Sequence, residues 1–150
     1  ILYGPEGVAV DAKGNIYVAD ASSNQIKIFS NEGSLIRQFG SEGNGNGQFS
    51  NPKALAIDKS GKIYVADLLN HRIQVFSNEG SFIRKFGSEG AENGQFSFPT
   101  GIALDLNGNI YVTSGQEILI FNNNGNLLRQ IKWQPNSSQD LLFKPNGIFV

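Results

Sequence analysis

The residues of this sequence that could carry chemistry begin with two aspartates that follow nearly identical apolar runs. Asp20 follows Ile16–Ala19, and Asp67 follows Ile63–Ala66. Either carboxylate could face a ligand, but a residue that recurs with its surroundings favours a role within each loop, as an acceptor of backbone N–H bonds. Arg72 lies five residues after Asp67. It could hold an anion such as phosphate, although its closeness to Asp67 predicts a local ion pair.

Three other aspartates fall at a different kind of position. Asp11, Asp58 and Asp105 each stand three residues before a glycine. Asp suits the first position of a turn because its carboxylate accepts N–H bonds from residues ahead, and Gly suits the last position because it tolerates positive φ. The run 105–109 has some oxygen-bearing side chains of a calcium loop but lacks the bidentate Glu that should follow. We therefore interpret all three as turns.

Composition excludes several classes of chemistry. The chain of 150 residues has no Cys and one His, which excludes a disulfide framework, cysteine–zinc sites, a Cys nucleophile and a His-rich metal cluster. Lys and Arg (12) almost balance Asp and Glu (13) for a net charge of −1, so bulk charge argues against nucleic acid as a partner, and no membrane insertion is expected. No cofactor is expected, apart from the alternative of a divalent cation considered below. There is no Met, which suggests a processed or excised piece.

The chain repeats itself, and this observation constrains the fold most strongly. Segments that begin at Pro5, Pro52, Pro99 and Pro145 are related, with spacings of 47, 47 and 46 residues. The linkers at 39–52 and 86–99 are also nearly identical, whereas the third, from Ile131, departs from the pattern.

Within each repeat the pattern indicates four short strands separated by turns, with no helical periodicity. In the first repeat these are 8–10, 16–19, 26–29 and 35–39. The second strand is continuously apolar, which predicts that both of its faces are buried between neighbouring sheets. Four antiparallel strands in about 47 residues describe one blade of a β-propeller. The predicted fold class is therefore an all-β propeller with three blades.

The repeats resemble those of the NHL β-propeller family. The resemblance rests on P-x-G-I/V-A-V/L-D-x-x-G-N-I-Y-V-A-D, followed by N-x-R-I-x-V-F and G-Q-F-x-x-P. The second repeat carries it most fully, through Asp67, Asn70, Arg72 and Phe76. The third departs from it, because Ser114 replaces the aspartate and the Asn-x-Arg loop is absent. The resemblance implies a six-bladed ring.

Three blades do not close such a ring, which needs roughly 280 residues. We expect one propeller segment over 1–150, with blades at about 5–51, 52–98 and 99–144 and the inner strand of a further blade at 145–150. An open half-ring should expose apolar faces of its end blades. Two interpretations stand: a fragment of a longer protein, or a protomer that associates with another copy through its open blade faces.

In a propeller the linkers and the loops between second and third strands share one face, and binding residues concentrate on such loops. Leu68 and Leu69 could form a contact patch there or pack against the neighbouring blade, and His71 alone is weak evidence of function. The candidate ligand-binding residues on this face are Glu6, Asn24, Lys53, Leu68, Leu69, Asn70, His71, Arg72 and Thr100, beside Ser22 and Ser23. No catalytic or metal-binding residue is assigned.

The function predicted from these features is a non-catalytic scaffold that binds a protein, peptide or glycan on the loop face. One alternative is a metal-dependent propeller hydrolase or lyase. The opening of the chain also resembles gluconolactonase-like propellers, in which a Glu at the place of Glu6 binds a divalent cation in the channel, although Lys53 at the corresponding place would oppose a metal. The other alternative is RNA binding through Lys53, His71 and Arg72, against which stand the acidic linkers.

Overall fold

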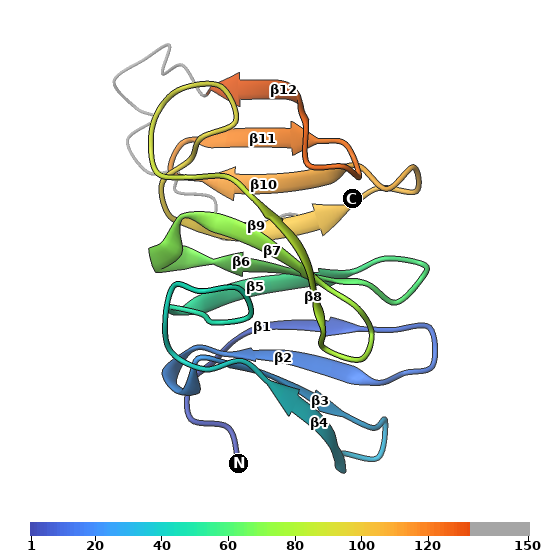
Figure 1. The fold of residues 1–150 in the computed structure, drawn as a ribbon. Coiled ribbons are helices and arrows are strands. Elements are labelled where there is room, and N and C mark those ends of the chain that lie inside the picture. Colours follow the sequence, from blue (N-terminus) through green and yellow to red (C-terminus); the bar gives the residue numbers. More distant parts are fainter. Residues whose placement is uncertain (133–150) are drawn as a thin grey trace, which may run out of the picture.

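The computed structural model describes residues 1–132, which form three four-stranded antiparallel sheets, or blades (Figure 1). Blade 1 comprises β1 (Pro5–Val10), β2 (Ile16–Asp20), β3 (Gln25–Phe29) and β4 (Leu35–Phe39). Blade 2 comprises β5 (Pro52–Ile57), β6 (Ile63–Asp67), β7 (Arg72–Phe76) and β8 (Phe82–Phe86). Blade 3 comprises β9 (Pro99–Leu104), β10 (Ile110–Ser114), β11 (Glu117–Phe121) and β12 (Leu127–Lys132). The predicted all-β propeller architecture is thereby confirmed.

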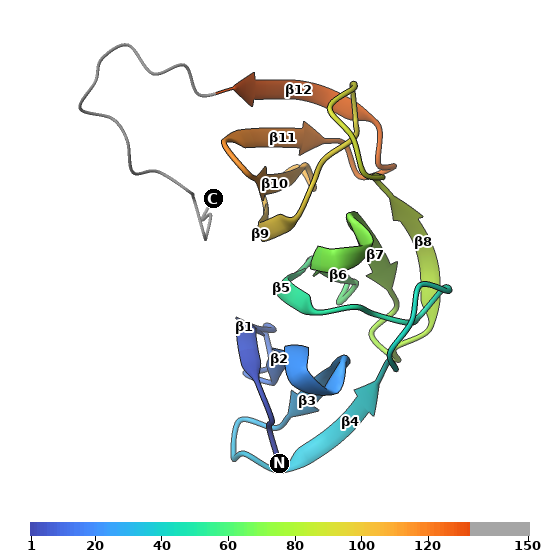
Figure 2. The ribbon, with the colours of Figure 1, turned by 90° about the vertical axis from the view of Figure 1, so that its left-hand side faces the viewer.

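The blades fan out along an arc, with β1, β5 and β9 on its inner side and β4, β8 and β12 on its outer side (Figure 2). Two short 3-10 turns, η1 (Ala21–Ser23) and η2 (Leu68–Asn70), connect the second and third strands of blades 1 and 2. The predicted inner strand at 145–150 and most of the third linker lie outside the described residues.

The turn after each inner strand forms as its Asp and Gly predict. The N–H of Gly14, at φ 83°, donates to the carbonyl of Asp11 at 3.0 Å. The Asp11 carboxylate accepts the N–H groups of Lys13 and Asn15 at 2.8 and 2.9 Å. Burial acts to raise the pKa of Asp11, but these bonds and one from the Asn15 side chain outweigh it and lower the pKa below 3.8. The turn interpretation of the three aspartates is confirmed, since Asp58 and Asp105 make the same backbone bonds.

Blade 2 shows why the second strand is apolar on both faces. All five residues of β6 are buried, because the sheet is stacked between blades 1 and 3. Residues of β6 alternate between the two interfaces: Ile63 and Val65 pack towards blade 1, while Tyr64 and Ala66 pack towards blade 3. The predicted burial of both faces is confirmed.

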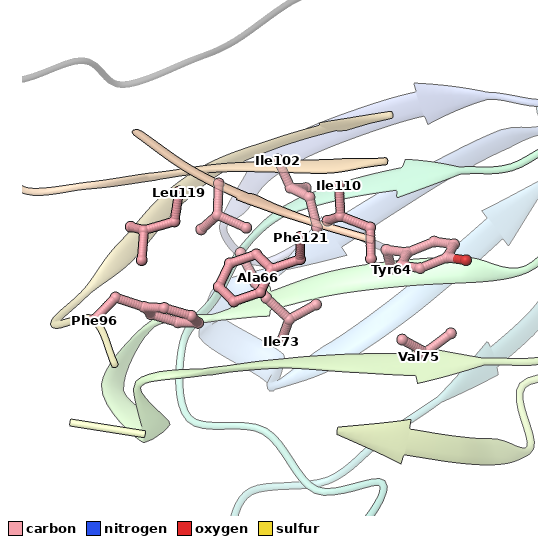
Figure 3. Close-up of a cluster of buried hydrophobic side chains, with 10 residues drawn as sticks. Tyr64, Ala66, Ile73, Val75, Phe96, Ile102, Ile110, Leu119 and Phe121 are labelled. Carbon is pink, nitrogen blue, oxygen red and sulfur yellow. The ribbon is translucent and has the colours of Figure 1, made fainter. Parts of the chain in front are cut away.

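The linkers 40–51 and 87–98 each add one aromatic ring to the interface between two blades. Phe49 is fully buried between blades 1 and 2, and its ring centroid lies 5.4 Å from that of Phe76. Phe96 takes the same place between blades 2 and 3, against Phe121 and the residues shown in Figure 3. The linkers thus fasten neighbouring blades together.

The inner strands approach closely, and the outward side of blade 1 is open. A Cβ on Gly7 would lie 2.8 Å from the Cα of Ala54, so only a glycine fits there without movement of the backbone. Val8 is 67% exposed, whereas Leu55, 47 residues later, is 5% exposed against blade 1. The expected exposure of an apolar end face is therefore present on blade 1.

No helix in residues 1–132 is long and apolar enough to cross a membrane.

Candidate binding face

The predicted loop residues gather at one end of the blades. Each blade is an antiparallel meander, so η1, η2 and the linkers 40–51 and 87–98 lie at the end where each second strand finishes (Figure 1). The hairpin turns lie at the opposite end. We call these two ends the loop face and the turn face.

In blade 2 the loop face is organised around a buried ion pair. The Arg72 Nε donates to Asp67 Oδ2 at 2.8 Å, and both side chains are almost fully buried. The remaining guanidinium nitrogens donate to the carbonyls of Asn44, Gly45 and Gln48, each at 2.9 Å. The predicted ion pair is confirmed, and it does more than pair charges, because Arg72 holds the linker 40–51 against the blade.

Two amide side chains complete this cluster. Asn70 Nδ2 donates to Asp67 Oδ2 and to the carbonyl of Gly43, both at 2.9 Å. Gln74 Nε2 donates to the carbonyl of Gln48 at 2.7 Å, and its Oε1 accepts the N–H of Gly47 at 3.0 Å. Asn70 was predicted on this face from its loop position. Gln74 was not predicted as part of this face, because a polar residue within a strand is normally expected to face solvent.

In blade 1 a lysine takes the place of the arginine as the partner of the aspartate. Lys27 Nζ lies 2.6 Å from Asp20 Oδ2 and donates to the carbonyl of Ile1 at 2.7 Å. Burial acts to raise the pKa of Asp20, but the bonds from Lys27 and from the amides of Gly4 and Tyr3 outweigh it and lower the pKa to about 2. Lys27 stands 47 residues before Gln74. Lys27 was not among the predicted residues, because the position 47 residues before Arg72 is occupied by the uncharged Gln25.

In blade 3 the acid and the cation are absent together. Ser114 occupies the aspartate position and donates to the carbonyl of Ser97, and the apolar Leu119 stands in the position of Lys27 and Gln74. A buried cation without a carboxylate would be strongly destabilising. The aspartate and its cation are thus present together in blades 1 and 2 and absent together in blade 3.

The prediction that each aspartate accepts bonds from its own loop was wrong about the donors. The backbone N–H groups bound by Asp67 and Asp20 come from the segment before the blade: Ser50 for Asp67 at 2.8 Å, and Gly4 for Asp20 at 2.7 Å. The segment before each blade passes over the end of the second strand, and this path places its N–H groups against the carboxylate.

The residue that closes each 3-10 turn also holds the next linker. Asn24 and His71 both have left-handed backbone conformations, with φ of 52° and 51°. Asn24 Oδ1 accepts the N–H of Asn51 at 2.8 Å, and His71 Nδ1 accepts the N–H of Phe98 at 3.2 Å. The predicted residues Asn24 and His71 are therefore contacts between loop and linker.

The inner rim of the loop face holds the other polar candidates. Glu6 and Lys53 form an ion pair across blades 1 and 2, with 2.9 Å between Nζ and Oε2. Thr100 Oγ1 lies 3.2 Å from Thr113 Oγ1. No group of three or more His, Cys, Asp or Glu side chains among residues 1–132 is arranged to hold a metal ion.

Of the two apolar candidates, Leu69 is the accessible one. Leu69 is 49% exposed, and Leu68 beside it is partly buried. A further apolar side chain, Phe98, is also 49% exposed. Phe98 was not among the predicted residues, because it falls on a variable position of the linker motif G-Q-F-x-x-P, whose own phenylalanine is Phe96.

The comparisons define the class of protein as a β-propeller. Residues 2–29 and 49–76 match the model of the NHL repeat, and residues 86–114 match a β-propeller repeat model. The weaker NHL character of blade 3 agrees with its loss of the aspartate and of the Asn-x-Arg loop. The chain therefore contains two NHL repeats followed by a further β-propeller repeat.

Solved structures share this fold at low sequence identity. A streptogramin B lyase matches with a TM-score of 0.69 and 20% identity over 88% of this chain. A virginiamycin B lyase from Staphylococcus aureus matches with 0.67 and 18% over 88%, and the RRP9 WD40 repeats match with 0.71 and 14% over 87%. The chain covers 41%, 42% and 39% of those three proteins, respectively. No curated protein sequence matches the chain at a significant level.

Proposed function

We propose that the chain belongs to a non-catalytic six-bladed propeller that recognises a protein or peptide through its loop face. The observation that carries this proposal is the engagement of the charged loop-face candidates within the fold. Asp20, Asp67 and Arg72 are buried and belong to the two ion pairs described above, and Glu6 is paired with Lys53. Such groups position loops, which leaves recognition to the exposed apolar side chains.

Rigidity supports this role. The linker 40–51 is tied to blade 2 by hydrogen bonds from Arg72, Asn70 and Gln74, and it inserts Phe49 into the core. A surface held in one conformation loses little conformational entropy when a partner binds. Preformed loops on stacked sheets are therefore suited to recognition.

Selection from a random peptide library displayed on phage tests the proposal. The 150-residue chain is immobilised, and enriched peptides are then titrated into the 15N-labelled protein and followed by NMR. We expect shifts at amides of η2 and of the linker 87–98. A double variant that restores the residue types of the preceding repeat, Leu69→Ser with Phe98→Asn, should weaken binding.

The matched control changes an exposed leucine of the turn face. Leu106 is 83% exposed on the turn between β9 and β10, so Leu106→Ser should leave binding unchanged. Shifts confined to turn-face amides, or no enrichment above an unrelated protein, would contradict the proposal. Metal-dependent hydrolysis of a lactone by the protein would support the enzymatic alternative instead.

A further inference from the structure

We infer that Phe98, His71 and Leu69 form a binding site for a bulky apolar side chain flanked by Lys or Arg in a partner peptide. This inference rests on the proposed function, and it names both the site within the loop face and the chemistry of the ligand. The argument starts from the conformation of Phe98.

Phe98 adopts a backbone conformation that its side chain disfavours. Its φ is 57°, and the corresponding residue in the first linker, Asn51, has φ 59°. Asn is among the residues that tolerate this left-handed region, whereas for a bulky residue it is a genuine outlier. Strained backbone of this kind concentrates at functional sites. The repeat therefore has a well-suited residue for this position, and the second linker departs from it.

Packing does not account for the phenylalanine. The aromatic ring that the second linker contributes to the core is Phe96, which is 1% exposed. Phe98 leaves about half of its surface in solvent instead. A strained residue with an exposed ring has a structural cost and little structural benefit.

The ring is nevertheless held in place. The N–H of Phe98 donates to His71 Nδ1 at 3.2 Å, and the two rings meet edge to face with centroids 4.7 Å apart. His71 also closes η2, because its N–H donates to the carbonyl of Leu68 at 3.2 Å. Phe98 is thus a preorganised aromatic surface, coupled to the turn that carries Leu69.

Leu69 shows the same change from polar to apolar. It is exposed, and Ser22 occupies its place in blade 1. The loop and the linker on either side of His71 have therefore both acquired an accessible apolar side chain relative to the preceding repeat. A cluster of aromatic and aliphatic side chains can serve as the anchor of a binding interface.

The surrounding charge indicates the partner. Glu89 is 72% exposed at its side chain, with its carboxylate 4.0 Å from His71 Nε2, and Glu92 is exposed on the same linker. The linker 87–98 contains no Lys or Arg. In contrast, Lys53 and Arg72 already have carboxylate partners. The field beside Phe98 is therefore acidic, which favours a cationic peptide and opposes a phosphate backbone.

NMR titration of the 15N-labelled 150-residue chain tests the inference with defined probes. The probes are the acetylated and amidated peptides Gly-Lys-Trp-Lys-Gly, Gly-Lys-Ala-Lys-Gly and Gly-Glu-Trp-Glu-Gly, together with a short oligouridine. We expect only the first peptide to shift the amides of Leu69, His71 and Phe98.

Two variants separate the site from the fold. Phe98→Asn restores the residue type found at Asn51, so it should fold and unfold at an equal or higher temperature while its Kd rises about tenfold. Leu69→Ser should also raise the Kd, and it provides a second test if Phe98→Asn disturbs the fold. Leu106→Ser on the turn face should bind like the parent chain.

An unchanged Kd for Phe98→Asn, equal binding of the acidic peptide, or binding of oligouridine through Phe98 would overturn the inference. The phage selection distinguishes this outcome from failure of the proposed function. Selected peptides that bind elsewhere on the loop face, or that lack the basic and apolar pattern, would leave the proposed function standing. Binding confined to the turn face would contradict both.

Discussion

The buried ion pair between Arg72 and Asp67, together with the bonds from Arg72 to the linker carbonyls, is called the clamp below. It leads to a prediction about how the linker 40–51 is held. Replacement Arg72→Ala removes one hydrogen bond to a buried carboxylate and three to the linker carbonyls. Loss of one partner from a buried ion pair costs about 3–5 kcal/mol, because the remaining charge is left uncompensated. The carbonyls lie on a surface linker where water can replace the guanidinium, so Asp67 dominates the cost. We expect a loss of about 4 kcal/mol and a fall in Tm on the order of 10 °C.

A double variant provides the internal control. Asp67→Ser with Arg72→Ala removes both charges, as blade 3 does with Ser114. Its free energy of unfolding should lie closer to that of the parent than the value for Arg72→Ala alone, and the double-mutant cycle should show a coupling of about 2 kcal/mol. Urea denaturation followed by circular dichroism measures these free energies.

Limited proteolysis tests whether the clamp acts on the linker itself. A glutamate-specific protease cuts after Glu42 if the linker 40–51 detaches, while Glu89 in the linker 87–98 serves as a reference. Arg72→Ala should accelerate cleavage after Glu42 more than cleavage after Glu89. A loss below about 1 kcal/mol together with unchanged cleavage at Glu42 would refute the proposed role of the clamp.

Three further predictions follow from other parts of the fold. The pKa of Asp20 is lowered from 3.8 to about 2, so its ionised carboxylate contributes its full stabilisation above pH 3.8 and loses it as the pH falls towards 2. In chemical denaturation, the difference in unfolding free energy between the parent and Asp20→Asn should therefore shrink between these pH values. A difference that stays constant would refute the assignment. Gly7→Ala should cost about 1–3 kcal/mol, since the new Cβ would meet the Cα of Ala54 at 2.8 Å, whereas Val8→Ala on the exposed face should change stability by about 0.5 kcal/mol or less. Light scattering after gel filtration should give either the chain mass of 16.3 kDa or twice that mass, and if the chains pair through the open face, Val8→Lys should restore the single-chain mass.

The repeat pattern explains why the fold was predictable. A strand buried between two sheets must be apolar on both faces, and β6 carries that requirement in adjacent residues. The turn at Asp11 is equally local, because its carboxylate binds N–H groups two and four residues ahead. Interactions within a few residues leave a pattern in the chain, and a spacing of 47 residues repeats that pattern. The candidate face was predictable for the same reason, since the meander places the loops at one end.

The roles of individual residues on that face depended on tertiary structure. The backbone N–H that Asp67 accepts and the carbonyls that accept from Arg72 lie 17 to 28 residues away along the chain, so no local spacing reveals them. Lys27 replaces Arg72 from a different strand position, because a long side chain can reach the same carboxylate by another route. Phe96 and Phe98 are indistinguishable by residue type, and only the path of the linker buries one ring and exposes the other. The sequence alone thus determined the blades and their order, whereas packing between linker and blade decided which side chains are structural and which are accessible to a partner.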